Sequence, residues 1–415
     1  MNRLASLSIA ALTLVACGVD KPKPSTMPPT TPVTTDASGV AVVNSDFKNS
    51  TSVSLFDPVT GALTHDNCVN SGSTAAGLSQ ALSGDVVLPS AAQPGHQLLL
   101  IDRTNAALTY LDPSTCAITR QFSVGTGFAA DPHDVVALSA TKAYATRYAA
   151  NGKPTENPAD FDEGDDLLIF NPTDGTIRGR IALTPFAGKV GDTAVLARPG
   201  IARLINGKVY VALDNLSDDY MTTADGRILV VDPATDTVSG MIDLPNLKGC
   251  SGLSSPSGTH DLVVTCVGDF NDPMQIKGSG IVAIDLTATP PAITSTLGAS
   301  AFGDAPQPLS ADAGGALSAT AGLAISLGGF KKVPPDRLWS YDAAAGTTAP
   351  LMDATDSFVF GALLSDPARK QVFLADGASD KPRIHVIDVS ATPTIKASFD
   401  PNPSVGLPPR ALGWY

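Results

Sequence analysis

Residues 198–215 read RPGIARLINGKVYVALDN, and residues 227–243 read RILVVDPATDTVSGMID. Together they hold four short runs rich in Val, Ile, Leu and Tyr, and Gly, Asn, Asp and Pro lie between the runs. Runs of this length and composition, bounded by turn residues, are typical of β-strands. We therefore predict four consecutive strands, named A to D in chain order, at 201–204, 208–213, 227–231 and 237–242.

The second half of this unit recurs along the chain. In each copy an apolar run ends in Asp or Asn, and a turn and a second apolar run follow. The marker residues lie 46 to 61 residues apart and are Asp57, Asp112, Asn171, Asp232, Asp285, Asp342 and Asp388. An Asp side chain bonds the turn backbone two residues on, and Pro, which follows four of the markers, stops a strand ladder. We interpret the markers as turn formers rather than as catalytic acids.

A period of this length, built from short strands, indicates a β-propeller in which each unit is one four-stranded antiparallel blade. Seven markers predict an all-β, seven-bladed domain over residues 39–415. The first unit holds only B, C and D strands, at 40–44, 53–56 and 62–65, whereas residues 409–415 follow the last D strand as an extra inner strand. Pairing this C-terminal strand with the first blade would close the ring and remove two open sheet edges.

The stretch at 198–215 resembles the YVTN family of propeller repeats, in which a Pro-containing entry leads to an inner strand, a Gly turn and a Tyr-Val strand. The resemblance is clearest in this blade and covers the rest of the domain only as the seven C and D hairpins. Other blades depart from it: His133, Asp134 and Val135 begin one inner strand, and the sixth blade is rich in Ala and Gly.

The N-terminus has the layout of a secretory signal peptide over residues 1–16, with a short basic start, a mostly apolar run at 4–16 and a small residue before Cys17. The segment LVAC at 14–17 resembles the lipobox of bacterial lipoproteins. That resemblance implies a lipidated Cys17 and a membrane anchor in the cell envelope, and Gly18 favours the outer membrane. The alternative is an ordinary signal peptide in which Cys17 is incidental. Residues 17–38, rich in Pro and Thr, are expected to form an extended tether.

The other four cysteines are an even number, which fits two disulfides in an oxidising compartment. Cys250 and Cys266 lie at equal distances from a turn at 257–258, so a hairpin would place them opposite each other. Cys68 and Cys116 form the remaining pair. Neither pair has the CxxC spacing of a zinc or redox site.

Charge and motifs restrict the function. The chain has 27 Lys and Arg against 40 Asp and Glu, and the net charge of −13 argues against a nucleic-acid partner, which would need clustered basic residues. The motifs GxSxG, HExxH, CxxCH, GxGxxG and the P-loop are all absent, so several enzyme classes lack their usual signature. An enzyme remains an option, because propeller enzymes assemble their sites from several blades and a fold does not decide function.

Three residues lie at predicted entries to inner strands, around the mouth of the central channel: His133, Arg198 and Arg410. One interpretation is a polar ring that binds a small anionic ligand. The alternative, which we favour, is that these side chains bond the backbones of neighbouring blades. The other histidines, His65, His96, His260 and His385, share no spacing and are interpreted as structural or surface residues.

Acidic residues gather in the long B–C loops of the third to fifth blades. Ca²⁺ takes six to eight oxygen ligands, which makes Asp162, Asp165 and Asp166 candidates for a calcium site. No segment matches an EF-hand or a calcium-binding nonapeptide repeat, so a solvated acidic rim is the preferred interpretation.

The leading hypothesis is an envelope-anchored lipoprotein whose propeller is a binding or scaffold module for an unknown protein or small molecule, without chemistry of its own. The second is a hydrolase or lactonase with its site at the channel mouth. The third is a Ca²⁺-stabilised surface adhesion protein.

Overall fold

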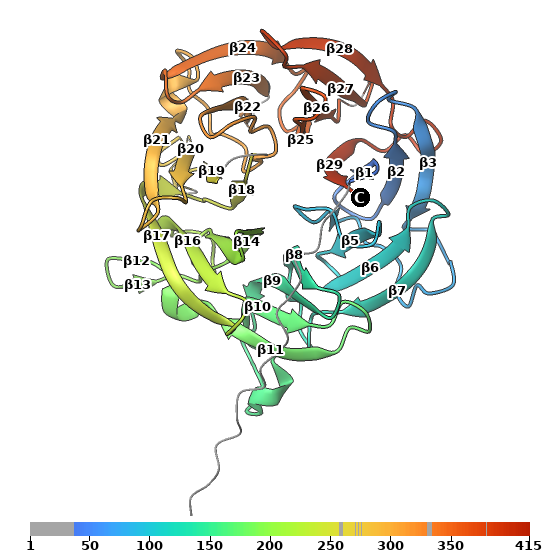
Figure 1. The fold of residues 1–415 in the computed structure, drawn as a ribbon, viewed down its shortest axis with the longest axis vertical. Helices are drawn as coiled ribbons and strands as arrows, with labels where there is room; N and C mark the ends of the chain where they lie inside the picture. The colour runs from blue at the N-terminus through green and yellow to red at the C-terminus, as the bar shows by residue number, and fades with distance from the viewer. Residues whose placement is uncertain are drawn as a thin grey trace, which may run out of the picture. The chain divides into compact units, whose positions relative to one another are not determined.

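The computed structural model describes residues 37–256, 260–269, 271–272, 274, 276–329, 334–378 and 380–415. The predicted signal peptide, the lipidation site Cys17 and the tether up to residue 36 lie outside these residues. Within the described part, seven antiparallel sheets are arranged around a central axis (Figure 1). The protein is therefore an all-β, seven-bladed β-propeller, as predicted.

The strands of each blade follow one another from the axis to the rim. In that order, blade 1 holds β29 (Pro409–Trp414), β1 (Val40–Ser45), β2 (Thr51–Phe56) and β3 (Leu63–Asn70), blade 2 holds β4 (Val86–Val87), β5 (Leu98–Asp102), β6 (Ala107–Asp112) and β7 (Ala117–Ser123), and blade 3 holds β8 (Pro132–Ser139), β9 (Lys142–Ala150), β10 (Gly164–Phe170) and β11 (Ile177–Ala182). Blade 4 holds β14 (Pro199–Ile205), β15 (Lys208–Leu213), β16 (Asp225–Asp232) and β17 (Thr237–Lys248), and blade 5 holds β18 (Gly252–Ser254), β19 (Asp261–Cys266), β20 (Gly280–Asp285) and β21 (Ala292–Gly298). Blade 6 holds β22 (Ala321–Ser326), β23 (Arg337–Asp342) and β24 (Thr347–Asp353), and blade 7 holds β25 (Phe360–Asp366), β26 (Gln371–Asp376), β27 (Arg383–Asp388) and β28 (Thr394–Phe399).

Few elements lie outside the blades. A two-stranded hairpin, β12 (Lys189–Val190) with β13 (Thr193–Ala194), precedes blade 4. Within the described ranges, the helical turns are η1 (Pro158–Asp160), η2 (Thr184–Phe186) and η3 (Ala299–Ala301). None of the helices among the described residues has the length and apolar character needed to cross a bilayer.

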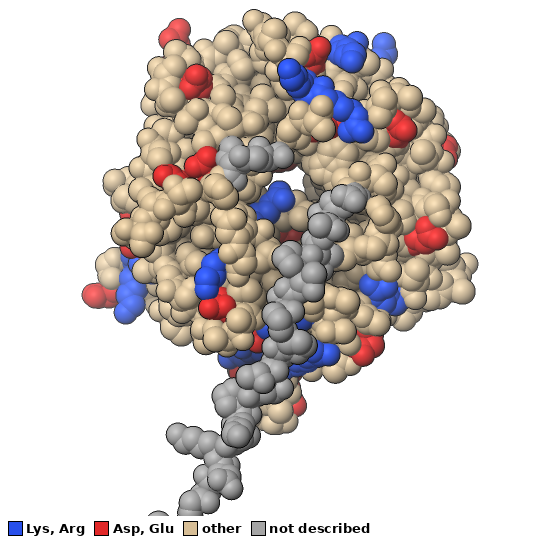
Figure 2. All heavy atoms as spheres, in the orientation of Figure 1, with Lys and Arg blue, Asp and Glu red and all other residues tan. Residues whose placement is uncertain are grey.

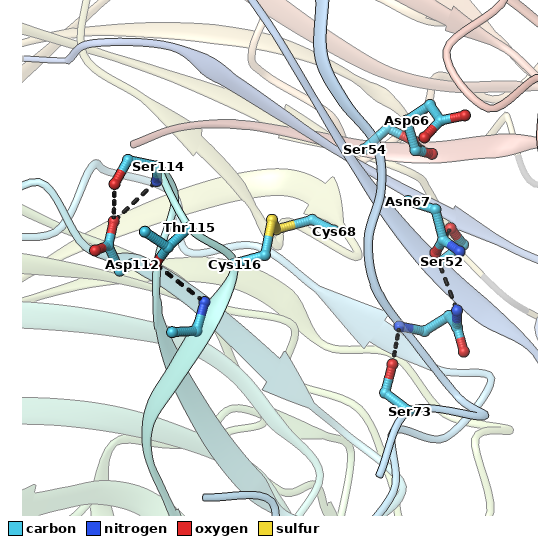
Figure 3. The surroundings of a disulfide bond; sticks show 12 residues. Ser52, Ser54, Asp66, Asn67, Cys68, Ser73, Asp112, Ser114, Thr115 and Cys116 are labelled. Carbon is cyan, nitrogen blue, oxygen red and sulfur yellow. Dashed lines mark hydrogen bonds between the residues drawn. A yellow bond between two sulfur atoms is a disulfide. The ribbon is translucent and has the colours of Figure 1, made fainter. Parts of the chain in front are cut away.

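All seven marker residues act as turn formers, as predicted. Each ends or follows the strand next to the outermost strand of its blade, and its side-chain oxygen accepts the backbone N–H two residues on. Figure 3 shows one case, in which the amide and the hydroxyl of Ser114 both donate to Asp112. These two hydrogen bonds lower the pKa of Asp112.

The hydrophobic core is divided into seven clusters, and each fills the space between two neighbouring blades. Successive side chains of a strand point to opposite faces of the sheet, so one strand serves two clusters. In β15, Val209 and Val211 pack against blade 3, whereas Tyr210 and Ala212 pack against blade 5. Both faces of a blade are therefore apolar and depend on a neighbour for their burial.

The C-terminal strand closes the ring, as predicted. β29 pairs antiparallel with β1, with Trp414 opposite Val40 and Ala411 opposite Val43. The pairing continues at Tyr415, whose backbone exchanges hydrogen bonds with Gly39. Blade 1 thus takes its innermost strand from one end of the chain and its other three from the beginning of the domain.

Blade 6 departs from the common pattern at its inner position. Its sheet has three strands, and only two isolated bridges, Leu309 with Ser326 and Ala316 with Gly322, join the preceding segment to β22. Close backbone contacts explain the glycines of this segment, since a Cβ on Gly314 would lie 1.9 Å from the Leu363 carbonyl oxygen. The inner segment therefore follows the axis without forming a full ladder.

Both predicted disulfides form. Cys68 of β3 is bonded to Cys116, in the turn between β6 and β7, and so joins blade 1 to blade 2 (Figure 3). Cys250 and Cys266 are bonded within blade 5. The turn at 257–258, which the prediction placed between them, lies outside the described residues.

A second kind of aspartate, which the sequence analysis did not identify, joins neighbouring blades. Asp336 is fully buried just before β23, and its carboxylate accepts the amide N–H groups of Phe358, Val359 and Phe360 at the entry to blade 7. It also accepts the N–H of Gly328 in its own blade. One carboxylate thus satisfies four backbone donors from two blades.

Two aspartates at opposite ends of β23 allow a matched test. We expect Asp336→Ala to lower the free energy of unfolding by at least about 3 kcal/mol, because several buried donors lose a charged partner. Asp342→Ala, at the exposed marker turn, should cost about 1 kcal/mol or less. Denaturant unfolding of both variants measures the difference, and equal losses would contradict the assigned roles.

Candidate functional site

The inner segments of the blades surround a cavity of about 380 Å³ at the axis, which we call the channel cavity. Figure 2 shows the opening at the centre of this face, with a basic side chain at its edge. Glycines in the inner segments let neighbouring blades approach closely: a Cβ on Gly252 would lie 1.6 Å from the Ala311 carbonyl oxygen, and one on Gly413 would lie 2.9 Å from Leu88. The cavity wall is therefore built largely of backbone and small apolar side chains.

Five ionisable side chains interrupt this wall. Arg103, His133, Arg203, Asp312 and Arg410 line the channel cavity. They come from blades 2, 3, 4, 6 and 1, respectively, so only the closed ring brings them together. Among them, only Asp312 carries a negative charge when ionised.

Arg203 is the first of the cavity cations that lack an ion-pair partner among the described residues. It follows Ile201 at a spacing of two along β14, and both side chains line the cavity. The Nε of Arg203 is buried without a hydrogen-bond partner, and no described carboxylate lies within ion-pair distance of its guanidinium. Burial lowers the pKa of Arg203, and the charges of Asp134 and Asp312 oppose that shift. An unpaired guanidinium therefore faces the cavity.

Asp312 lies in the inner segment of blade 6. Its carboxylate accepts the N–H of Gly314 at 2.6 Å and the N–H of Leu363 in blade 7 at 2.8 Å. It borders the cavity but is otherwise enclosed by protein, and this burial raises the pKa of Asp312 to about 6, against the opposing effects of the two N–H groups and of Arg203. Its charge thus changes near neutral pH.

His133 also lines the cavity, in β8. Its Nε2 lies 3.3 Å from a carboxylate oxygen of Asp131, and its ring stacks on that of Tyr148 at 4.3 Å between centroids. The contact does not meet hydrogen-bond geometry, since the Nε2 of His133 is buried without a hydrogen-bond partner among the described residues. Burial alone would raise the pKa of Asp131, but the nearby imidazole of His133 lowers it overall. An acid and an imidazole thus lie close together at the cavity.

Arg410 lies in β29. Its guanidinium donates to the carbonyl oxygens of Phe358 at 3.1 Å and Ser45 at 3.4 Å, and it stacks over Phe47 at 5.0 Å from the ring centroid. No described carboxylate forms an ion pair with it, whereas Arg103 is paired with Asp85. Arg203 and Arg410 are therefore the two unneutralised cations of the cavity.

Arg198, the third residue expected at the channel mouth, does not line the cavity. Its side chain is buried between the rings of Tyr148 and Tyr220, and the guanidinium donates to the carbonyl oxygens of Leu216 and Ser217. These contacts fix the loop between β15 and β16. Of the three predicted residues, the structure thus brings His133 and Arg410 to one cavity and gives Arg198 a structural position.

The three aspartates considered for calcium do not converge on a common point. Asp166 forms a buried ion pair with Arg147 at 2.6 Å. Asp165 accepts the backbone N–H groups at 197 and 198, and Asp162 accepts the N–H of Thr155. Over the described ranges, no group of three or more His, Cys, Asp or Glu is placed to hold a metal ion. A calcium site here stays a prediction without geometric support.

Sequence reasoning missed Arg203 and Asp312. Arg203 had a usable signal, because it is a charged residue in a predicted inner strand, on the same face of the strand as Ile201. Asp312 had none, since its place depends on an irregular segment of blade 6 and on contacts with blade 7.

Comparison with known proteins supports the fold but shows no family. No family model matches the chain, and no curated protein matches it significantly. Among solved structures, a putative 6-phosphogluconolactonase from Bacteroides fragilis is 11% identical, with a TM-score of 0.54 over 93% of this chain and 100% of that one. A protein from Lactobacillus plantarum is 12% identical, with a TM-score of 0.54 over 92% of this chain and 100% of that one. Hydrazine synthase from Kuenenia stuttgartiensis is 10% identical, with a TM-score of 0.52 over 88% and 99%. At such identities these likenesses show the propeller fold alone, and membership of the YVTN family stays a prediction.

The raised pKa of Asp312 predicts a pH dependence of stability. Because its folded pKa of about 6 exceeds the ordinary Asp value of 3.8, the folded protein binds this proton first as the pH falls. The contribution of Asp312 to stability is thus full below about pH 4 and is lost as the pH rises through about 6. We expect the unfolding free energy of the wild type, relative to Asp312→Asn, to fall by up to about 3 kcal/mol between those limits. Urea unfolding of both proteins over this pH range is the measurement, and a constant difference would refute the assignment.

Proposed function

We propose that this protein is an exported, lipid-anchored binding module whose channel cavity takes a small anionic ligand. The observation that carries the proposal is the pair of guanidinium groups, Arg203 and Arg410, that face one cavity without an ion-pair partner among the described residues. A buried charge without a partner is costly, and a bound carboxylate or phosphate would supply one. The glycine-lined wall leaves space at the axis for such a ligand.

Carboxylate and phosphate are the ligand groups that suit this site. Arginine binds both through two parallel hydrogen bonds, and two arginines from different blades could hold one anionic group from two directions. Asp312 opposes an anion when it is ionised, so binding should strengthen as the pH falls through its pKa of about 6. The ligand would thus be small, anionic and bound more tightly in mildly acidic conditions.

Exchange of one cavity arginine tests the binding site. We expect inorganic phosphate, gluconate or citrate to bind the wild-type protein in titration calorimetry, and Arg203→Gln to weaken binding at least about tenfold, because one unpaired cation is lost. Arg178→Gln is the matched control, since Arg178 is exposed on the outer strand β11. No binding of any of the three anions at millimolar concentration, or equal binding by Arg203→Gln, would contradict the proposal.

The export and anchor rest on the sequence and on the two disulfides. LVAC at 14–17 supports lipidation, and Cys68–Cys116 and Cys250–Cys266 fit an oxidising compartment such as the bacterial envelope. Attached acyl chains would hold the protein at a membrane through the burial of their CH₂ groups.

The anchor has a direct test. We expect mass spectrometry of the mature protein to find an acylated Cys17 as its first residue, and Cys17→Ala to move the protein from the membrane fraction to the soluble fraction, because the acyl chains are lost. A mature N-terminus without a lipid would refute the anchor and leave the channel site unaffected.

A hydrolase or lactonase at the channel mouth is the second candidate. The proximity of His133 and Asp131 favours it, because an imidazole beside a carboxylate is a common arrangement for general acid–base catalysis. Turnover of a lactone that is abolished by His133→Gln would favour this function over simple binding.

A further inference from the structure

Three polar side chains on the three outer strands of blade 7 form a hydrogen-bonded chain, away from the axis of the propeller. The Oγ of Ser398 lies 2.7 Å from the Nδ1 of His385, and the Nε2 of His385 lies 3.0 Å from a carboxylate oxygen of Asp376. They come from the neighbouring strands β28, β27 and β26, and His385 pairs directly with Ser398 in the strand register. The order Ser, His, Asp is that of a nucleophile, a base and the group that orients the base.

The hydrogen-bond partners of the His385 imidazole determine which of its two ring nitrogens carries the hydrogen. A carboxylate only accepts hydrogen bonds, so the Nε2 of His385 carries the hydrogen that Asp376 receives. The neutral ring then has its lone pair on Nδ1, where it can accept the hydroxyl hydrogen of Ser398. The other carboxylate oxygen of Asp376 accepts the N–H of Ala378, which holds the carboxylate in place. His385 is thus oriented as a base toward Ser398.

The nucleophile of this hydrogen-bonded group is exposed, whereas the two residues behind it are largely buried. The side chain of His385 is only 8% exposed and that of Asp376 13%, whereas Ser398 lies on the exposed outer strand. Ser398 also lines a surface pocket of about 310 Å³ with Lys381, Arg383 and Phe399. A reagent could therefore reach the hydroxyl, while the base and its carboxylate are shielded from bulk water.

The same pocket is lined by two basic residues, Lys381 and Arg383, and by two acidic residues, Asp380 and Asp400. Within the described part of the chain, neither basic head group forms an ion pair with a carboxylate. Arg383 donates from Nε to the carbonyl oxygen of Lys381, and its terminal nitrogens form no hydrogen bond with the described residues. Cations beside a nucleophile can stabilise the negative oxygen that develops during acyl transfer.

We propose that Ser398 is an activated nucleophile in an acyl-transfer site for small carboxylic esters, separate from the channel cavity. Its Oγ attacks the ester carbonyl carbon while the hydroxyl proton passes to Nδ1 of His385. The bond from that carbon to the alcohol oxygen then breaks, and the leaving alkoxide takes the proton from His385. Water next gives one proton to His385 and adds its oxygen to the acyl carbon. The acyl–Ser398 bond breaks, and the serine oxygen regains the proton, so the products are an acid and an alcohol.

An alkyl fluorophosphonate tests this proposal on the folded wild-type protein. Attack by Ser398 forms a P–O bond and releases fluoride, and His385 takes the proton. We expect peptide mass spectrometry to find the adduct on Ser398, formed at least about tenfold faster than on Ser239. Ser239 is a matched control within the same molecule, because it is exposed on an outer strand but donates to the carbonyl oxygen of Val230.

Variants separate activation from a structural role. His385→Gln should slow labelling of Ser398 at least about tenfold, and Asp376→Asn should do the same, since an amide that donates to Nε2 would place the ring hydrogen on Nδ1. The wild-type rate should rise with pH as a single histidine loses its proton, a profile that a merely structural hydrogen bond would not produce. Ser398 that labels no faster than Ser239, or labelling that is unchanged in His385→Gln, would overturn the proposal whatever the stability of the variants.

Discussion

The burial of both faces of every blade between its neighbours is the constraint on which this structure depends. Each of the seven apolar clusters draws side chains from two blades, so a row of blades would leave two apolar faces in water. A ring leaves none. The chain therefore has to bring its two ends together, and the pairing of β29 with β1 does so through ordinary strand hydrogen bonds. The disulfide between Cys68 and Cys116 then reinforces the contact between the first two blades.

Closure also creates the channel cavity and determines what can line it. Inner segments of all blades meet at the axis, where glycine is needed because neighbouring backbones come close, as at Gly252 and Gly314. Few long side chains fit there, so each one that points inward faces the same small space. Arg203 and Arg410 come from blades 4 and 1, and neither forms an ion pair with a described carboxylate. Asp312, the acid that lines the same cavity, is itself held by two backbone amides.

How much could be predicted from the sequence depends on the range of each interaction. The marker turns were predictable because an Asp such as Asp112 bonds the backbone only two residues on, and seven such turns were enough to predict the ring. The closing strand was predictable because the first unit lacks an inner strand and residues 409–415 supply one. Contacts between blades carry no such local signal. Asp336 looks like any other aspartate until blade 7 lies against it, and Arg198 looks like a channel residue until two tyrosines enclose it. The irregular inner segment of blade 6 was unpredictable for the same reason, because its glycines are required by close contacts with the backbone of blade 7.

The chain of Ser398, His385 and Asp376 is an intermediate case, and it shows why the two proposed sites differ in their dependence on the fold. His385 was interpreted as structural or surface because no repeated spacing marked it. Its partners nevertheless lie within one meander, and antiparallel register alone places Ser398 opposite it. A single blade is therefore enough to assemble that group. The channel cavity, in contrast, has ionisable residues from five blades and exists only when the C-terminal strand has closed the ring. Loss of closure should therefore remove the anion site first. The hydrogen-bonded residues of blade 7 should keep their arrangement as long as the sheet of that blade stays folded.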